Sequence, residues 1–597
     1  MKKFNGLYIF ALLFLFFNSH SLIAQSPDKK NPNHNIVNKY IKNTVFNNNY
    51  NYHKPIDSLV ARKLAEWQKL KFGLMMHWGP YTQWNIIESW TLCSDPTSPW
   101  NTRTGPYAED YDSYKTAYEN LQHTFNPYLL NPNDWSIAAS NAGMKYLVFT
   151  VKHLDGFCMY SSNLTNYNIS DTSCPFHSDP RNNIANVVFN EFRSKGFFIG
   201  MYYSKADWYC RDYWWKAFAT PGVRVNYPPQ TFPEKWAKYV QYIHNQINEL
   251  MTTLGRVDII WLDACWVNPL DNNQNIQISQ IAQIARTAQP GLIMVNRYLE
   301  EYEDYLTPEE KMPENPIDYP WELCMPIGHV WAHIVEDSLF YKSTDSIIHT
   351  LAEVAGKGGN LLLNIAPNQY GQWHYKAYTR LTEIGNWMNI NGSAIYETIH
   401  TMPFRENNIF FTLKGDTTFA LYLKYDNQTT MPAQISWSSH LPYLNTNIYL
   451  LGYPLPLNYT VIQNAVYVNI PPELQNNPPC RHAWVFKIVN RSPMIFGNRN
   501  EIKLPDKYVL YQNYPNPFNP TTTIKFDLPS FHNKLLKPVQ LKIYDILGRE
   551  IKMLVNEFLE PGTYSIKFKG KDFPSGIYFM ELKTSDYSET RKLVLAK

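Results

Sequence analysis

The chain has 597 residues, of which 44% are hydrophobic and 18% charged, so it is long enough for several domains and too apolar to be disordered. Its 54 lysine and arginine residues against 51 aspartate and glutamate residues leave a net charge of +3. With no long basic run, this balance excludes nucleic acid as an expected partner. Aromatic residues reach 15%, which fits either carbohydrate binding or all-β packing.

The N-terminus has the pattern of a secretory leader. Lys2 and Lys3 precede an apolar run at 7–17, and small residues ending at Ala24 follow a polar break. The apolar run is too short to cross a bilayer, so we expect no permanent membrane span. We therefore predict a cleaved leader at 1–24 and an exported protein. Residues 25–52, rich in Asn, Lys and Pro, are predicted to be a linker.

Residues 53–395 alternate short apolar runs with longer amphipathic stretches, which predicts repeated βα units. The helix candidates are 133–142, 184–195, 234–254 and 276–287, and the strand candidates are 72–77, 146–153, 197–204, 257–263, 292–297, 321–325 and 360–366. A doubly wound sheet and a barrel both fit this alternation. Polar residues at the ends of many runs favour the barrel, whose active sites form at the C-terminal ends of its strands. These residues are His77, His153, Asp155, Ser204, Asp263, Arg297 and Glu322.

The C-terminal third is predicted to be all-β. Short strand patterns at 409–413, 419–425, 433–437, 447–451, 465–470 and 483–488 indicate an antiparallel sandwich at 396–491. A linker at 492–507 and a small all-β domain at 508–597 follow. The predicted fold class is thus α/β, with a (β/α)8-like barrel followed by an antiparallel β-sandwich and a small C-terminal all-β domain.

The candidate chemistry is that of paired carboxylates. Asp263 ends an apolar strand, while Glu309 and Glu310 follow in the loop after Arg297. Cleavage of a glycosidic bond needs two carboxyl groups, one to attack or activate water and one to protonate the leaving oxygen. His77 and His153 are neutral partners suited to sugar hydroxyls. The seven cysteines lack CxxC pairs, and no HExxH, GxSxG or phosphate-loop pattern occurs, so we predict no metal and no cofactor.

Seven ordered motifs between about residues 54 and 398 resemble glycoside hydrolase family 29, the α-L-fucosidases. They are residues 71–80, 152–157, 200–208, 260–263, 295–297, 320–324 and 357–367. The resemblance implies a retaining exo-glycosidase with a barrel and a sandwich, acting on a fucosylated oligosaccharide or glycoconjugate. It implies Asp263 as nucleophile and Glu309 as acid/base, with Glu310 as rival.

The same resemblance implies a set of residues that hold the fucose ring. They are His77, Glu88, His153, Tyr203, Trp208 and Arg297, with Tyr202 as a possible substitute for Tyr203. One departure is Leu154, in Lys152-His-Leu-Asp-Gly-Phe157, where the family pattern has a second histidine. We expect Leu154 to line the sugar pocket. Two alternatives stay open, a glycosidase acting on another sugar such as an α-L-galactoside, and a surface lectin without turnover.

The tail resembles a second family. Segments 514–520, 545–548, 561–564 and 575–578 are similar to the C-terminal sorting domain of type IX secretion. The resemblance implies the type IX secretion machinery as a partner. It also implies a route through the periplasm of a Gram-negative bacterium to the cell surface or the medium. The alternative is an ordinary β accessory module that binds sugar.

Overall fold

A computed structural model describes residues 52–93, 103, 107–219, 222–297, 302–443, 446–489, 505, 507–529, 537–559 and 562–597 of the chain. The chain divides into two compact units, Met1–Met494 and Ile495–Lys597. The predicted leader at 1–24 and nearly all of the predicted linkers at 25–52 and 492–507 lie outside the described residues. Within the described part, no helix combines the length and the apolar character needed to span a bilayer.

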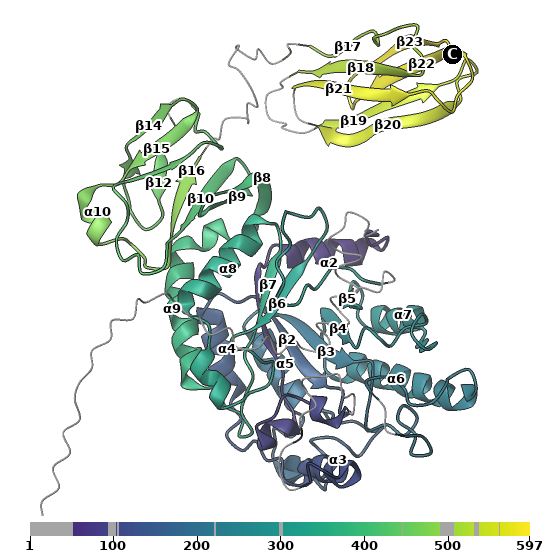
Figure 1. Ribbon diagram of the computed structural model, residues 1–597, viewed down its shortest axis with the longest axis vertical. Coiled ribbons are helices and arrows are strands. Elements are labelled where there is room, and N and C mark those ends of the chain that lie inside the picture. The colour runs from purple at the N-terminus through teal and green to yellow at the C-terminus, as the bar shows by residue number, and fades with distance from the viewer. Residues whose placement is uncertain are drawn as a thin grey trace, which may run out of the picture. The chain divides into compact units, whose positions relative to one another are not determined.

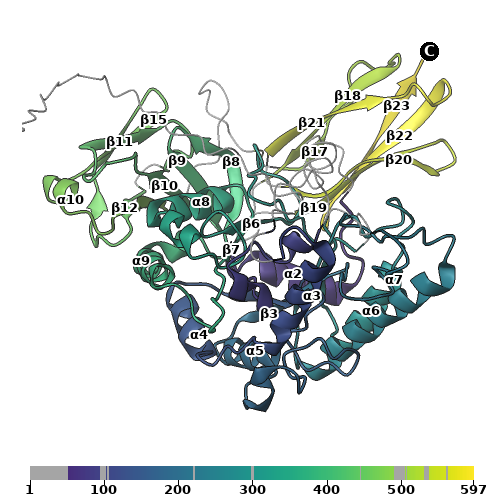
Figure 2. The ribbon, with the colours of Figure 1, turned by 60° about the horizontal axis from the view of Figure 1, so that its bottom comes forward.

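The first unit is built on seven parallel strands in the order β5-β4-β3-β2-β1-β7-β6 (Figures 1 and 2). Almost every strand residue is buried, as expected for strands that are covered on both faces. All seven predicted apolar runs form strands, so the predicted parallel α/β architecture is confirmed. The bounds are β1 (Phe72–Met76), β2 (Tyr146–Lys152), β3 (Phe198–Ser204), β4 (Ile259–Asp263), β5 (Ile293–Val295), β6 (Glu322–Pro326) and β7 (Asn360–Asn364).

An irregular extended segment, residues 304–310, completes the barrel wall between β5 and β6. The backbone N–H of Asp304 donates to a carbonyl of β5 (2.9 Å), and that of Glu310 donates to a carbonyl of β6 (3.0 Å). The sequence predicted a loop here. Pro308 cannot donate to a ladder, which explains why the segment lacks a regular strand pattern. The backbone of Glu309 is therefore part of the barrel wall.

Helices cover the outside of this sheet (Figure 1). The four predicted helices correspond to α4, α5, α6 and α7 within two residues at each end. In α5, Ile184, Val188 and Phe192 recur at a spacing of four and are all buried, so one helix face packs on the sheet. The helices are α2 (Ser58–Gln68), α3 (Tyr111–Glu119), α4 (Pro132–Asn141), α5 (Ile184–Ser194), α6 (Pro233–Thr253), α7 (Ile278–Ala288), α8 (Thr344–Gly356) and α9 (Tyr375–Asn391).

An antiparallel sandwich follows in the same unit. Its sheets have the orders β13-β12-β16-β10-β9-β8 and β11-β15-β14 and enclose a separate apolar core. The indole of Trp387 in α9 donates to the carbonyl of Ala483 in β16 (2.9 Å), which ties the sandwich to the barrel helices. Its elements are β8 (Ile399–Glu406), β9 (Ile409–Lys414), β10 (Thr417–Leu423), β11 (Gln434–Trp437), β12 (Ile448–Leu450), β13 (Pro456–Leu457), β14 (Tyr459–Ile462), β15 (Ala465–Asn469), α10 (Pro472–Asn476) and β16 (Ala483–Ile488).

The second unit is a small all-β domain with its own core. Two antiparallel sheets, β17-β18-β21 and β20-β19-β22-β23, bury alternate residues such as Ile524, Phe526, Leu541 and Met580. The strands are β17 (Val509–Leu510), β18 (Thr521–Leu528), β19 (Lys537–Tyr544), β20 (Glu550–Leu559), β21 (Gly562–Lys569), β22 (Gly576–Lys583) and β23 (Ser588–Leu595). The predicted fold class is thus confirmed in all three of its parts.

Candidate active site

The C-terminal ends of the parallel strands enclose a cavity in which six of the eight predicted site residues meet. Polar groups from several strand ends converge there, as in other barrels of this type. Tyr203 and Trp208 are the two predicted residues that do not line it. The lining residues are Met75, His77, Glu88, Trp90, His153, Tyr202, Trp261, Asp263, Arg297, Glu309, Cys324 and Trp331.

Arg297 joins the two candidate catalytic carboxylates. Its Nε lies 3.2 Å from Oδ1 of Asp263, and its Nη2 lies 2.6 Å from Oε2 of Glu309. All three side chains are almost fully buried, with exposures of 1% for Arg297, 8% for Asp263 and 6% for Glu309. Ion pairs in such an environment are weakly screened, so one guanidinium holds both carboxylates in a fixed relation.

Asp263 is held in its ionised form. Burial alone would raise the pKa of its carboxyl group, but the charge of Arg297 and a hydrogen bond from Tyr202 outweigh burial and leave the pKa below its usual value. The Tyr202 hydroxyl donates to Oδ2 of Asp263 at 2.5 Å. An ionised, buried carboxylate at the mouth of a barrel has the character of a nucleophile.

The neighbouring glutamates occupy different environments. Glu309 lines the cavity and accepts a hydrogen bond from the indole Nε1 of Trp331 (3.0 Å) in addition to its ion pair with Arg297. Glu310 is exposed, does not line the cavity and has a left-handed backbone (φ 53°). The geometry therefore favours Glu309 over Glu310 as the partner of Asp263.

His77 and His153 are neutral at physiological pH, because burial lowers the pKa of His77 to about 4 and that of His153 to about 3. The Asn364 amide donates through Nδ2 to the carbonyl of Trp331 (2.7 Å), so its Oδ1 is the atom that faces Nδ1 of His77 (3.3 Å). Nδ1 of His77 consequently carries the proton, which leaves Nε2 as an acceptor for a ligand hydroxyl. His153 pairs through Nδ1 with the hydroxyl of Ser89.

Glu88 offers a protonated carboxyl group to the same cavity. Burial raises the pKa of Glu88 to about 8, against the hydrogen bond that its carboxylate accepts from the backbone N–H of Ala332. The negative charge of Glu309 raises this pKa further. Near neutral pH Glu88 can therefore donate a hydrogen bond to a ligand, which an ionised carboxylate cannot do.

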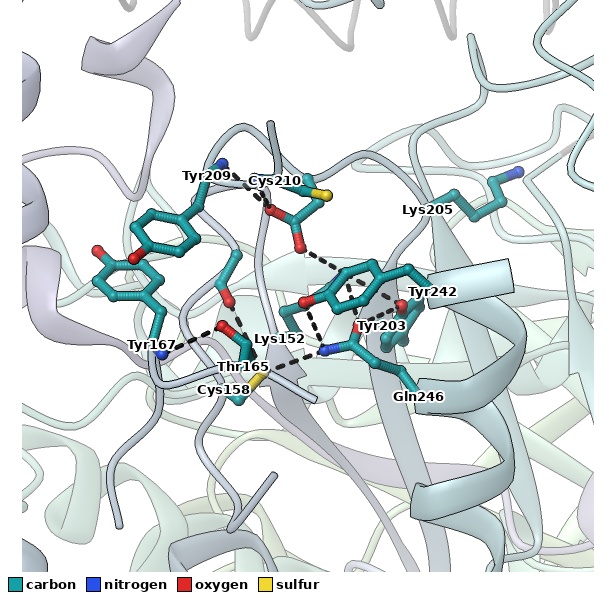
Figure 3. A network of polar contacts seen from close by, with 12 residues as sticks. Lys152, Cys158, Thr165, Tyr167, Tyr203, Lys205, Tyr209, Cys210, Tyr242 and Gln246 are labelled. Carbon is teal, nitrogen blue, oxygen red and sulfur yellow. Dashed lines mark hydrogen bonds and ion pairs between the residues drawn. The ribbon is translucent and has the colours of Figure 1, made fainter. Parts of the chain in front are cut away.

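The prediction that Tyr203 lines the site is wrong, and its stated substitute Tyr202 takes that place. Successive strand residues face opposite sides of a sheet, so only one of the two tyrosines of β3 can face the cavity. Tyr203 faces the helix layer, where its hydroxyl donates to Oε1 of Gln246 in α6 (2.7 Å) and lies 3.0 Å from Nζ of Lys152 (Figure 3).

Trp208 and Leu154 also lie outside the cavity. The indole of Trp208 is fully buried, stacks on Trp214 (ring centroids 5.0 Å apart) and meets Trp90 edge to face (5.7 Å), so it supports a lining residue from behind. Leu154 is fully buried in the apolar core and does not line the cavity. The expectation that it lines the sugar pocket is therefore wrong, because its apolar side chain is buried more favourably in the core.

Three lining tryptophans were not predicted from the sequence. Trp261 stands two residues before Asp263 on the same strand, so strand alternation could have identified it. Trp90 and Trp331 come from loops that are far from Asp263 in sequence, and no periodic pattern marks them. Among the described residues, no cluster of His, Cys, Asp or Glu is arranged to hold a metal ion.

A fully buried ion pair supports the site from the helix side. Nζ of Lys152 lies 3.1 Å from Oδ2 of Asp207, and it also contacts Tyr203 and Gln246, which Figure 3 shows around it. Oδ1 of Asp207 accepts two backbone N–H groups, from residues 209 and 210. Lys152 directly precedes His153, so this ion pair joins the end of β2 to the loop after β3.

Replacing Lys152 by Met is expected to lower the free energy of unfolding by about 3–5 kcal/mol, because Asp207 would remain buried without its cation. Urea unfolding followed by tryptophan fluorescence measures this. The control is Lys235→Met, which breaks a partly exposed ion pair with Asp212 (19% and 34% exposed) and should change stability by less than about 1 kcal/mol. Equal effects of the two variants would contradict a structural role for the buried pair. Lys152→Met/Asp207→Asn should be more stable than Lys152→Met, because it removes the unpaired charge.

Three family models match the chain. Residues 39–393 match the model described as Alpha-L-fucosidase. Residues 403–489 match the Alpha-L-fucosidase C-terminal domain, and residues 512–596 match the Secretion system C-terminal sorting domain. The three matches follow the order of the barrel, the sandwich and the C-terminal all-β domain.

Individual relatives agree with these matches. The chain is 25% identical over 456 residues to an alpha-L-fucosidase of Branchiostoma floridae, covering 72% of this chain and 94% of that protein. It is also 25% identical over 457 residues to the plasma alpha-L-fucosidase of Homo sapiens, covering 73% and 91%. Among solved structures, alpha-L-fucosidase isoenzyme 1 from Paenibacillus thiaminolyticus is similar with a TM-score of 0.59 and 25% identity, over 73% of this chain and all of that one.

Proposed function

Because the chain belongs to the alpha-L-fucosidase family of glycoside hydrolases, we propose that it removes α-L-fucose from oligosaccharides or glycoconjugates by a retaining double displacement. The observation that carries this proposal is the pairing of Asp263 and Glu309 through Arg297 in a buried cavity at the strand ends. Two carboxyl groups in one cavity are what glycosidic cleavage requires.

In the first half of the proposed reaction, Asp263 attacks the anomeric carbon of fucose while Glu309 protonates the departing glycosidic oxygen. Arg297 and Tyr202 keep Asp263 ionised, which suits it to the attack and leaves the acid role to Glu309, the other carboxyl group beside Arg297. The products are the free aglycone and a covalent fucosyl ester of Asp263.

In the second half, Glu309 is ionised and takes a proton from a water molecule that attacks the same carbon. The bond to Asp263 breaks, and fucose leaves with its original anomeric configuration. Nη2 of Arg297 lies 2.6 Å from Oε2 of Glu309 and holds this base in position for the step. Arg297 also stabilises the carboxylate of Asp263 as it is released.

The remaining lining residues supply recognition of the sugar. His77, His153, Glu88 and Tyr202 offer hydrogen-bonding groups for the ring hydroxyls. The indole rings of the lining tryptophans offer apolar surface for the ring face and for the methyl group that fucose carries in place of a 6-hydroxyl. Tyr203 and Trp208 act indirectly, through the contacts described above.

Hydrolysis of an aryl α-L-fucoside, with the released sugar followed by proton NMR, tests this function. The first product should be the α-anomer of fucose, and the β-anomer would contradict retention. The α-L-galactoside alternative depended on Leu154, which lies outside the cavity, so an aryl α-L-galactoside should be the poorer substrate. Failure to cleave either glycoside would favour the alternative of a surface lectin.

Replacing Tyr202 by Phe is expected to lower kcat/KM for the aryl fucoside about 10- to 100-fold, because a hydrogen bond to a charged group contributes roughly 1.5–3 kcal/mol. That bond lowers the pKa of Asp263, so its loss raises this pKa. The acidic limb of the pH profile of kcat/KM should therefore move to higher pH. Tyr203→Phe is the matched control. An equal shift of the acidic limb in Tyr203→Phe would contradict the assignment of this limb to Asp263 and its hydrogen bond from Tyr202.

The sorting tail supports export to the cell surface or the medium, and we propose that the type IX machinery of a Gram-negative bacterium carries it there through the periplasm. Deleting residues 508–597 removes a domain with its own core and should leave kcat/KM unchanged, while the protein accumulates inside the cell. Activity assays on cell fractions measure this. Normal export of the truncated protein would contradict the proposal.

A further inference from the structure

A second cavity, of about 450 Å³, lies between the N-terminal part of α6, the start of α7 and the loops that precede the two helices. The two helices pack side by side (Figures 1 and 2). They follow β3 and β4 respectively, and helices that follow barrel strands begin at the C-terminal end of the barrel. The cavity is therefore at the same end of the barrel as Asp263, on its outer rim, and it shares no lining residue with the first cavity.

The lining of this second cavity has an unusual chemistry. It contains no Asp, Glu, Lys or Arg, and half of its twelve residues carry side-chain amides. Its inner part is mainly apolar, with Pro229, Trp236 and Val240 all buried. The fourth buried residue there is His244, whose Nε2 pairs with the carbonyl of Ile276 (2.9 Å). The amide residues are Gln230, Gln241, Asn273, Asn275, Gln277 and Gln280, and all six are exposed.

Most of these amides are available to a ligand. Within the described part of the chain, the side chains of Gln230, Asn273, Gln277 and Gln280 form no hydrogen bond with other protein groups. Asn273 and Gln277 have left-handed backbones (φ 50° and 56°), a conformation that is uncommon for glutamine. Gln277 also precedes α7 without capping it through its side chain. Each amide can both donate and accept a hydrogen bond.

This combination selects a class of ligand. A charged ligand would find no opposite charge and would lose hydration without compensation. An apolar ligand would leave the amides without partners. A neutral molecule with many hydroxyl groups and an apolar face satisfies both the amides and the apolar inner part, and a carbohydrate is such a molecule.

The β4–α7 loop connects the second cavity to the catalytic one. It starts directly after Asp263, and Gln274 donates to the carbonyl of Trp266 (2.8 Å), while the indole of Trp236 donates to the carbonyl of Asn275 (2.8 Å). The ring of Trp266 in turn meets Trp90, a lining residue of the catalytic cavity, at a centroid distance of 6.1 Å. The loop thus lines the second cavity with Asn273, Asn275 and Gln277 and packs through Trp266 behind a residue that lines the catalytic one.

We propose that the second cavity binds the neutral sugar residues that lie beyond fucose in the substrate glycan. This proposal rests on the proposed function and extends it from the fucose to the chain that carries it. Such a site favours fucosylated oligosaccharides over short fucosides through binding, without contact with the reacting atoms.

The test uses Ala237→Trp, which places a large side chain in the cavity from an exposed, lining position of α6. The matched control is Asn248→Trp, an exposed position of the same helix that does not line the cavity. We expect Ala237→Trp to raise KM for a neutral fucosylated tetrasaccharide at least fivefold. Its kcat, and both constants for 4-nitrophenyl α-L-fucoside, should stay unchanged, and Asn248→Trp should match the unmodified enzyme.

Binding is measured separately from turnover. Calorimetric titration of the tetrasaccharide into the full chain carrying Asp263→Ala should give a dissociation constant that rises at least fivefold on adding Ala237→Trp. Gln241→Leu/Gln280→Leu, which keeps the size of the side chains and removes two amides, should weaken binding in the same direction. Circular dichroism checks that each variant is folded.

An unchanged dissociation constant and KM in Ala237→Trp would overturn the proposal, as would equal effects of Asn248→Trp. Failure of the proposed function is recognised separately, because the unmodified enzyme would then not hydrolyse 4-nitrophenyl α-L-fucoside at all. In that case the titration still tests whether the second cavity binds the tetrasaccharide, since binding does not depend on turnover.

Discussion

Replacing Asp263 by Ala is expected to lower kcat for an aryl α-L-fucoside by more than about a thousandfold, the loss that follows removal of a covalent nucleophile. Without this carboxylate the fucosyl ester cannot form, and Arg297 loses its ion pair with Asp263 while it keeps the one with Glu309. The fold should persist, because Asp263 ends its strand at the cavity and is not part of an apolar cluster. Steady-state kinetics and circular dichroism measure the two outcomes.

Azide provides the decisive addition to this experiment. The space left by the Asp263 carboxylate can admit this small anion, which should attack an activated aryl fucoside directly and restore part of the rate. One displacement inverts the anomeric centre, so the product should be a β-fucosyl azide.

Asp258→Asn is the matched control, because Asp258 lies at the opposite end of β4 and pairs with Lys63. It should affect stability more than kcat. A rate above about a thousandth of the original in Asp263→Ala would exclude the nucleophile role.

Replacing Glu309 by Ala is expected to slow cleavage of substrates with poor leaving groups roughly 100- to 10,000-fold, the contribution of general acid catalysis. The aglycone of a natural glycoside would have to leave as an alkoxide unless its oxygen is protonated, whereas a nitrophenolate leaves without help from an acid. The first step for an activated aryl fucoside should therefore fall much less. Pre-steady-state measurement of aryl release from both kinds of substrate separates the two cases.

Glu310→Ala is the natural comparison, since the residue adjoins Glu309 in sequence but is exposed and outside the cavity. We expect it to leave both substrates nearly unaffected. A larger loss for Glu310→Ala than for Glu309→Ala would reassign the acid/base. Equal losses of Glu309→Ala on good and poor leaving groups would instead indicate a positioning role through Arg297.

The location of Asp263 could be predicted from the sequence, because a physical rule relates the apolar pattern of a buried strand to the edge of the sheet at which the strand ends. A strand buried on both faces is continuously apolar, so the charged residue that ends it marks the edge of the sheet. In a parallel barrel all such edges meet at one end. His77, His153 and Arg297 follow from the same rule, and all three line the cavity with Asp263.

The choice between Tyr202 and Tyr203 could not be made by that rule. Both residues lie in a strand that is apolar throughout, and alternation shows only that they face opposite sides. The side is set by packing, with Gln246 of α6 and Lys152 of β2 around Tyr203 and Asp263 beside Tyr202. Leu154 shows the same limit, because a motif position does not reveal whether a side chain turns toward a ligand or into the core.

By itself the sequence determined the seven parallel strands, four of the helices that cover them, the three-part architecture and most of the strand-end groups, because these depend on local periodicity and on which residues must be buried. Glu322 is the exception, because it begins β6 instead of ending it. Only the tertiary structure decided which groups act together. Arg297 bridges two carboxylates that are 46 positions apart (residues 263 and 309), Trp331 reaches Glu309 from a loop, and a second cavity forms where α6 meets α7. These contacts join segments that are distant in the chain, and they arise when the barrel closes and brings its strand ends and helix ends together.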